Sequence, residues 1–136
     1  MDFALLKKQI AAVNKAFYER VFKDPWLVQI FQNVRQEFIE SQQTDFMLGA
    51  FGGPKEYSGR SPSDAHPHIY VTEEMWQLRE QYLKEAFEET GFPQEHRAKW
   101  LKIDEAFKRS IVKSSPSECT PRFKTDPILD FPNPKS

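Results

Sequence analysis

Apolar side chains recur every three or four residues along most of the chain, which is the spacing of one face of an α-helix. The first such stripe contains Ile10, Val13, Phe17 and Val21. Behind it, Asp24 and Pro25 are typical of a helix start, because aspartate caps free backbone N–H groups and proline suits the first helical position. We therefore expect a short helix or turn over residues 26–34.

The same spacing predicts three further helices. One covers residues 37–51 and ends at Gly52-Gly53-Pro54, because two glycines and a proline cannot continue a helix. The next begins after Thr72, a residue type that caps helix N-termini, and closes at Gly91. The last opens near Pro93, and one of its faces carries Trp100, Ile103, Phe107 and Ile111. No segment shows the alternation of a strand, so the expected fold class is all-α.

The C-terminal segment of the chain is rich in proline. Half of the ten prolines fall within residues 116–136. Because proline has no backbone N–H, such a segment cannot be a helix or an inner strand. We expect one domain over residues 1–113, followed over residues 114–136 by a Pro-rich tail that either lies extended on the body or is disordered.

Charge and composition narrow the class of protein. Lysine plus arginine is 19 and aspartate plus glutamate is 20, so the net charge is −1 and nothing favours nucleic acid as a partner. The longest nearly uncharged stretch, residues 46–54, is far shorter than the roughly 20 residues of a membrane helix. Lys7 and Lys8 interrupt the apolar run that a signal peptide needs, and Cys119 has no second cysteine to pair with. These features predict a cytoplasmic protein without membrane insertion.

Two helices carry polar residues where their stripe should be apolar. In the 37–51 helix these are Gln42 and Gln43, so at least one amide is expected to face the interior. Either the helix is rotated with both amides at its edge, or this face lines a pocket that needs a hydrogen-bond donor, since a buried amide without a partner is costly. In the following helix the break is Arg79, which could reach the surface, pair with a carboxylate or meet an anionic ligand.

The connection between Gly52 and Thr72 has no helical spacing. Connections of that length in a compact domain are usually functional or disordered. This one contains His66 and His68, which in isolation are typical of a surface pair. A zinc site has little support from one cysteine and no His-Glu-x-x-His spacing, and neither a phosphate loop nor a nucleophile elbow is present. Hydrolase and nucleotide-binding functions are therefore not supported.

Taken together, these residues resemble a known family. The motif set consists of Phe17-Tyr18, Phe31, Gln43, Gly52-Gly53-Pro54, Tyr57, His66, Val71-Thr72 and Trp76. In residue types and spacing it resembles the truncated haemoglobins, and the similarity extends from about Phe17 to Phe107. The resemblance implies a short globin in which two helix pairs cross around a haem, a 2-over-2 arrangement. An extended segment then replaces most of the helix that carries the iron ligand.

The resemblance also implies roles for individual residues. His66 matches the proximal iron ligand, whereas Tyr18 and Gln43 match the distal pair that faces bound O2. Phe31 matches the phenylalanine that packs on the haem face. His68 stays open as an alternative iron ligand, because Pro67 lies beside His66.

Further haem-pocket positions follow from the same match. Those expected to line the pocket are Ile39, Phe46, Met47, Val71, Trp76 and Arg79, and those expected near the haem propionates are Tyr57, Arg60 and His68. Arg79 departs from the family pattern, which usually has an apolar or aromatic residue at this position.

The implied function is a haem b protein that reversibly binds O2, and also NO or CO, as an oxygen-binding or oxygen-transport protein or a gas scavenger. Two alternatives stay open. The first is an enzyme that converts NO to nitrate with O2 and takes electrons from an external reductase, because the sequence has no flavin or nicotinamide motif. The second is a haem-free α-helical scaffold that interacts with partners through its tail.

Overall fold

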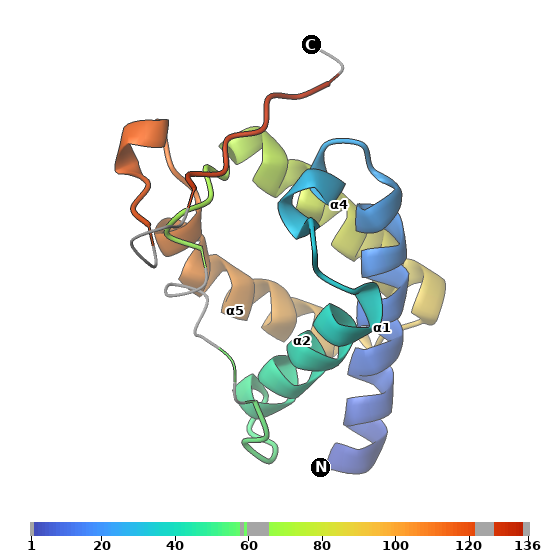
Figure 1. Cartoon of the computed structure of the whole chain (residues 1–136). Helices are drawn as coiled ribbons and strands as arrows, with labels where there is room; N and C mark the ends of the chain where they lie inside the picture. Colours follow the sequence, from blue (N-terminus) through green and yellow to red (C-terminus); the bar gives the residue numbers. More distant parts are fainter. Residues whose placement is uncertain (1, 58, 60–65, 122–126, 135–136) are drawn as a thin grey trace.

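The computed structural model describes residues 2–57, 59, 66–121 and 127–134, and Figure 1 shows the path of the chain. Its helices, in chain order, are α1 (Phe3–Lys23), the 3-10 turn η1 (Leu27–Phe31), α2 (Gln36–Ala50), α4 (Glu73–Thr90), α5 (Gln94–Ile111) and the 3-10 turn η2 (Pro116–Glu118). Within the described residues, extended pairing is limited to two isolated bridges, Ile69 with Leu129 and Val71 with Val112. The predicted all-α class is confirmed.

Helix boundaries follow local chemistry that the sequence already displays. Asp24 Oδ1 accepts hydrogen bonds from the backbone N–H groups of Trp26 and Leu27, at 2.9 Å each, and so starts η1. Thr72 Oγ1 accepts from the N–H of Met75 at 3.1 Å and caps α4. Gly91 ends α4 in the left-handed conformation, with φ of 65°, which costs glycine no side-chain clash.

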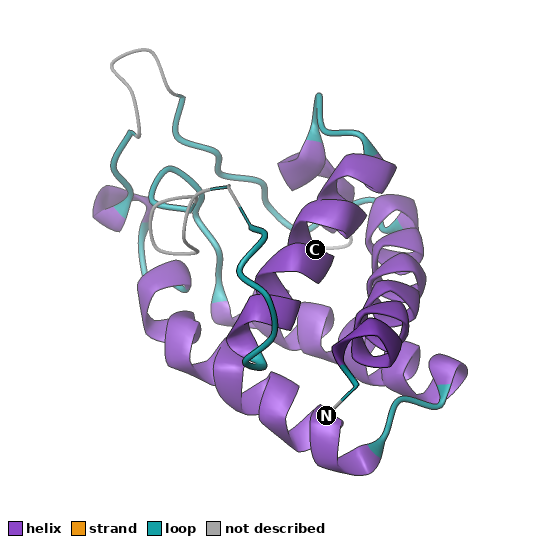
Figure 2. Ribbon diagram, turned by 90° about the horizontal axis from the view of Figure 1, so that it is seen from below, coloured by secondary structure: helices purple, strands orange, loops and turns teal. Residues whose placement is uncertain are grey.

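The core is built on α1, which packs against both α2 and α4 (Figure 2). Its predicted stripe is buried throughout, as are five apolar residues of α4: Met75, Trp76, Leu83, Ala86 and Phe87. Asn14 of α1 donates from Nδ2 to Thr44 Oγ1 of α2 at 3.0 Å, a buried hydrogen bond that joins the two helices. Phe87, Phe92 and Trp100 form an aromatic cluster at the turn between α4 and α5. No helix in the described part of the chain is long and apolar enough to cross a membrane.

The described parts of the C-terminal tail run back along the segment before α4 (Figure 1). Leu129 donates its N–H to the carbonyl of His68 and accepts from the N–H of Tyr70, both at 2.8 Å. Thr120 donates to the carbonyl of Pro67 at 2.8 Å. These bonds attach the tail to the segment that carries His66. The division into a domain over residues 1–113 and a tail over 114–136 stays a prediction.

Deleting residues 127–136 is expected to lower the free energy of unfolding by about 3 kcal/mol, since each hydrogen bond from Leu129 and Phe131 to the body of the protein contributes roughly 1 kcal/mol net. The deletion removes both bonds of Leu129 and the 2.6 Å bond from Trp26 Nε1 to the carbonyl of Phe131. Urea denaturation of the full and shortened chains measures the loss, and Ile128→Ala, at an exposed position, is the matched control. A loss below about 0.5 kcal/mol would show that these contacts do not stabilise the fold.

A tyrosine–carboxylate contact joins α4 to the start of η1. The Tyr82 hydroxyl donates to Asp24 Oδ2, and burial together with this bond raises the pKa of Tyr82 to about 12. An unfolded tyrosine ionises near pH 10, so the contact stabilises the fold fully below about pH 10 and is lost as the pH rises toward 12. Tyr82→Phe should therefore be less stable than the natural chain at pH 8, and the gap should close by pH 12. Thermal melts across this pH series test the expectation, and a gap that does not change with pH contradicts it.

Candidate functional site

A cavity of about 480 Å³ lies between the helices and has walls from α1, η1, α2, α4 and α5. This volume is within the usual range for cofactor and ligand sites, and most of the lining side chains are apolar or aromatic. The cavity gathers most of the residues that the sequence singled out as a site: Tyr18, Phe31, Ile39, Gln43, Phe46, Met47, Tyr57, His66, Val71, Trp76 and Arg79.

Tyr18 and Gln43 provide hydrogen-bond donors in the wall. Tyr18, from α1, is 7% exposed and packs edge-on against Phe17 and Phe31, with ring centroids 4.8 and 5.8 Å away. Burial raises the pKa of Tyr18, so its phenol stays protonated at neutral pH and can donate. Gln43 reaches the same cavity from α2. No hydrogen bond within the described residues engages either side chain, which leaves both donors to a ligand in the cavity.

His66 is the one histidine among the described residues that line the cavity. It precedes α4 in an irregular segment, whose backbone is held in place by a lysine beyond α5. Lys113 Nζ donates to the carbonyls of His66, Ile69 and Ile111 at 3.0, 2.8 and 2.9 Å. Burial lowers the pKa of this ammonium group. The lysine therefore ties the His66 segment to the end of α5, a positioning role that its sequence context did not indicate.

One predicted site residue among those that the structure describes is not brought to the cavity. His68 is buried, at 5% exposure, but it does not belong to the lining, and its carbonyl pairs with the tail residue Leu129. The geometry therefore favours His66 over His68 as the residue that faces a ligand. Arg60 lies outside the described residues.

Other lining residues were not predicted as site residues. They include Gln42, Asn14 and Asp104. The position of Asp104 carries a readable signal: it falls four residues after Trp100 and three before Phe107, on the apolar stripe of α5. An acidic residue on an apolar stripe needs a buried partner. That partner is Arg79, the residue that breaks the stripe of α4, and its Nη2 lies 3.0 Å from Asp104 Oδ2.

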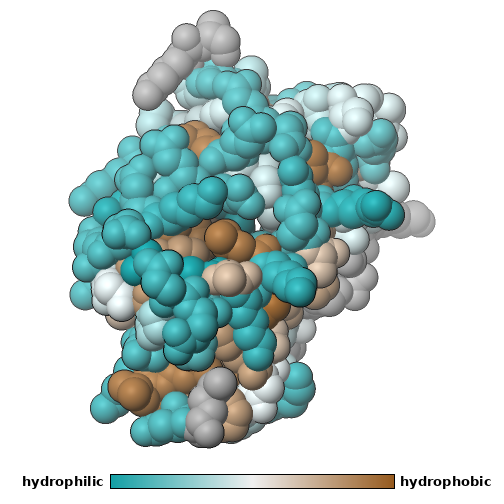
Figure 3. Space-filling model, turned by 180° about the vertical axis from the view of Figure 1, so that it is seen from behind, coloured by the Kyte–Doolittle hydropathy of each residue, from teal (hydrophilic) through white to brown (hydrophobic). Residues whose placement is uncertain are grey.

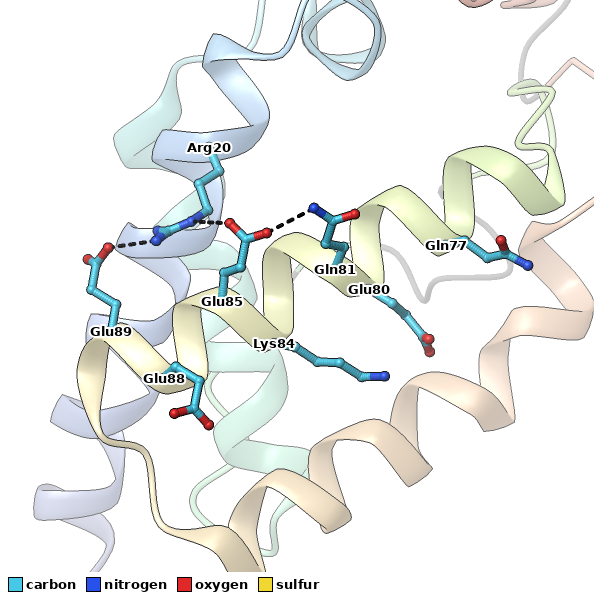
Figure 4. Close-up of a pocket in the computed structure, with 8 residues that line it drawn as sticks. All are labelled: Arg20, Gln77, Glu80, Gln81, Lys84, Glu85, Glu88 and Glu89. Carbon is cyan, nitrogen blue, oxygen red and sulfur yellow. Dashed lines mark hydrogen bonds and ion pairs between the residues drawn. The ribbon is translucent and has the colours of Figure 1, made fainter.

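A separate open groove runs along the outer face of α4 (Figure 4). It is lined by charged and amide side chains, and Arg20 of α1 forms ion pairs there with Glu85 and Glu89 at 3.3 and 2.8 Å. Exposed ion pairs of this kind contribute little to stability. Seen from behind, the surface of the molecule is largely hydrophilic, and apolar side chains appear on it in separate places (Figure 3). The groove contains none of the predicted site residues.

The donor set of the cavity fits a haem. Among the described residues, no three His, Cys, Asp or Glu side chains gather to hold a bare metal ion. A haem iron, in contrast, is already held by its macrocycle and needs one imidazole and an apolar pocket with a few polar groups on the ligand side. The cavity provides this combination in His66, Tyr18, Gln43 and an aromatic lining. Such a fold and site define a haem-binding protein of the globin class.

Comparison with known proteins agrees with this class. Residues 5–113 match the family described as "Bacterial-like globin". Two relatives are group 1 truncated haemoglobins from Tetrahymena pyriformis and Tetrahymena thermophila, each 36% identical over 50 residues, which is 37% of this chain and 41% of theirs. A third is the group 1 truncated haemoglobin GlbN of Synechocystis, 38% identical over 58 residues, which is 43% of this chain and 46% of that protein. The matched region thus spans less than half the length of these relatives.

The chain belongs to the bacterial-like globin family, and the predicted truncated-globin fold is confirmed. Membership in a globin family implies a haem cofactor and a small gas ligand such as O2. The roles of the individual site residues stay predictions.

Proposed function

We propose that this protein binds O2 reversibly through haem b held in the cavity, with His66 as the iron ligand. His66 would hold the haem through its neutral imidazole, and the ferrous haem would supply the iron to which O2 binds reversibly. The observation that carries the proposal is that two hydrogen-bond donors with no partner among the described residues, Tyr18 and Gln43, line the same apolar cavity as His66.

Each residue has a distinct task in this proposal. His66 holds the iron through its imidazole, and Lys113 keeps the His66 backbone in place through the carbonyls that it binds. Tyr18 and Gln43 donate hydrogen bonds to O2, which gains partial negative charge on binding, and preorganised donors stabilise such charge best in a cavity that excludes water. Phe31 and Met47 are part of the apolar lining that excludes water.

Cycling the purified ferrous protein between air and argon tests the proposal. The expected result is a spectrum that changes on addition of O2 and returns fully when O2 is removed, with CO competing for the same site. Immediate oxidation to the ferric form at the first exposure to air would contradict reversible O2 binding. A protein that takes up no haem would support the scaffold alternative.

The enzymatic alternative uses the same residues. Conversion of NO and O2 to nitrate consumes one electron for each NO, so it needs an external reductase. Measuring NO consumption and nitrate formation, with and without a generic ferredoxin or flavodoxin reductase, separates this activity from carriage of O2. Sustained turnover would support the enzyme, whereas a single stoichiometric burst would support a carrier. The cytoplasmic location stays a prediction.

A further inference from the structure

The part of the cavity wall that the structure describes contains one ion pair. Among the described lining residues, Arg79 and Asp104 carry the only charges apart from the titratable His66. Arg79 extends from α4 and Asp104 from α5, and Nη2 to Oδ2 measures 3.0 Å. The Asp104 side chain is 10% exposed and that of Arg79 is 29% exposed. The carboxylate is therefore the more deeply buried member, and part of the arginine stays accessible.

The guanidinium is held in a fixed orientation. Its central carbon lies 4.7 Å from the ring centre of Trp76 and 5.6 Å from that of Phe17. An arginine between two aromatic rings gains cation–π stabilisation and loses rotational freedom. Phe17 packs in turn against Tyr18, with ring centroids 4.8 Å apart. Arg79 is therefore placed on the side of the cavity that carries the tyrosine donor.

The hydrogen bonds of Arg79 are incomplete. A guanidinium has five N–H donors, and here one is engaged by Asp104. Nη1 is buried and has no acceptor in the described part of the chain. Buried donors without acceptors are rare in folded proteins and often mark the place of an ion or a water. Arg79 therefore keeps a buried N–H donor, at Nη1, that no described residue accepts from.

The charges of the pair reach the tyrosine as well. Burial raises the pKa of Tyr18, while the positive charge of Arg79 lowers it and the negative charge of Asp104 raises it. Both charges therefore act on the same donor that is proposed to contact a ligand. A negatively charged ligand beside Tyr18 would be attracted by Arg79 and repelled by Asp104.

The geometry points to Arg79 as an anion-selecting residue, which makes the cavity a site for small monovalent anions of the size of fluoride, nitrite or formate when the haem is ferric. This inference rests on the haem function proposed above. Arg79 donates a charged hydrogen bond to the anion, and Asp104 holds the guanidinium while weakening its attraction for negative charge. Arg79 would then allow the cavity to distinguish anions from neutral gases, whereas Tyr18 and Gln43 donate hydrogen bonds to O2.

The test compares fluoride with imidazole, a neutral ligand of ferric haem, by spectral titration of the ferric protein. Three proteins are needed: the natural chain, Asp104→Asn, and the double variant Arg79→Met with Asp104→Asn. The last two differ only at Arg79, and neither leaves a buried carboxylate without its counter-ion. Arg79→Lys is a further variant that keeps the charge and loses the planar fork.

Fluoride should bind several-fold more tightly to Asp104→Asn than to the natural chain. It should bind about ten- to a hundredfold more weakly to the double variant than to Asp104→Asn, the range expected for a charged hydrogen bond. Arg79→Lys should fall between the natural chain and the double variant. Imidazole affinity should change less than about twofold in all of them.

Equal changes for fluoride and imidazole would overturn the inference, because they would report a reshaped cavity. Unchanged fluoride affinity with weaker haem retention would also overturn it, since Arg79 would then act on the haem itself. The Soret band of the natural chain separates the two proposals. If it is absent, the haem function fails, and if it is present with unchanged fluoride affinity in all variants, only the role of Arg79 fails.

Discussion

Replacing His66 with alanine is expected to abolish stable haem binding, the largest single effect that the structure predicts. His66 is the one histidine in the described cavity lining, and its removal leaves the iron without a protein ligand. Added imidazole should restore a haem spectrum, because a free imidazole fits the space that the side chain vacates. Haem titration of the purified apoprotein, followed at the Soret band with and without imidazole, measures both effects.

His68→Ala is the matched control. This histidine is two residues away and buried, but it lies outside the cavity lining. The variant should keep a natural haem spectrum even if it loses some stability through its buried position. The assignment of His66 is wrong if His68→Ala loses haem while His66→Ala keeps a five-coordinate ferrous spectrum.

Tyr18→Phe should accelerate O2 dissociation by about ten- to a hundredfold. A hydrogen bond to a strongly polarised partner contributes about 1.5–3 kcal/mol, and every 1.4 kcal/mol is a factor of ten. The substitution keeps the ring that packs against Phe17 and Phe31 and removes only the hydroxyl. CO acquires less charge when it binds, so its dissociation should change much less. Stopped-flow measurement of both gases gives the comparison.

Gln43→Leu should act in the same direction as Tyr18→Phe. If the two side chains also bond each other around a ligand, the double variant will lose less than the sum of the single effects, because neighbours in one network are not additive. Equal small effects on O2 and CO would mean that neither side chain touches the ligand.

Local chemistry explains why much of the fold could be predicted from the sequence. Asp24, Thr72 and Gly91 act as caps through bonds that span two to four residues, so their signals are visible without a tertiary structure. The interruption of an apolar stripe by Gln43 made a pocket one of two explanations, and the break at Arg79 allowed a carboxylate partner or an anionic ligand; both residues line the cavity. The spacing of apolar residues indicates which face of a helix is buried, and a polar residue on that face needs a hydrogen-bond partner.

The remaining features depend on contacts between distant parts of the chain. Lys113 binds the carbonyl of His66 across 47 positions, and nothing in its local sequence distinguishes it from a surface lysine. The pairing of Leu129 with the backbone around His68 is equally non-local. The contact between Asp104 and Arg79, in contrast, could have been predicted from the sequence. Asp104 interrupts the apolar stripe of α5 and Arg79 interrupts that of α4, so a comparison of the two helices would have suggested that these opposite charges form a pair.

Absorption spectra of the ferric, ferrous and CO forms of the protein, after addition of one equivalent of haem, test the central claim most directly. The account predicts a saturable Soret band at a 1:1 ratio, a five-coordinate ferrous spectrum and a sharp shift of the band with CO. A folded, α-helical protein that gives only the spectrum of free haem would contradict it.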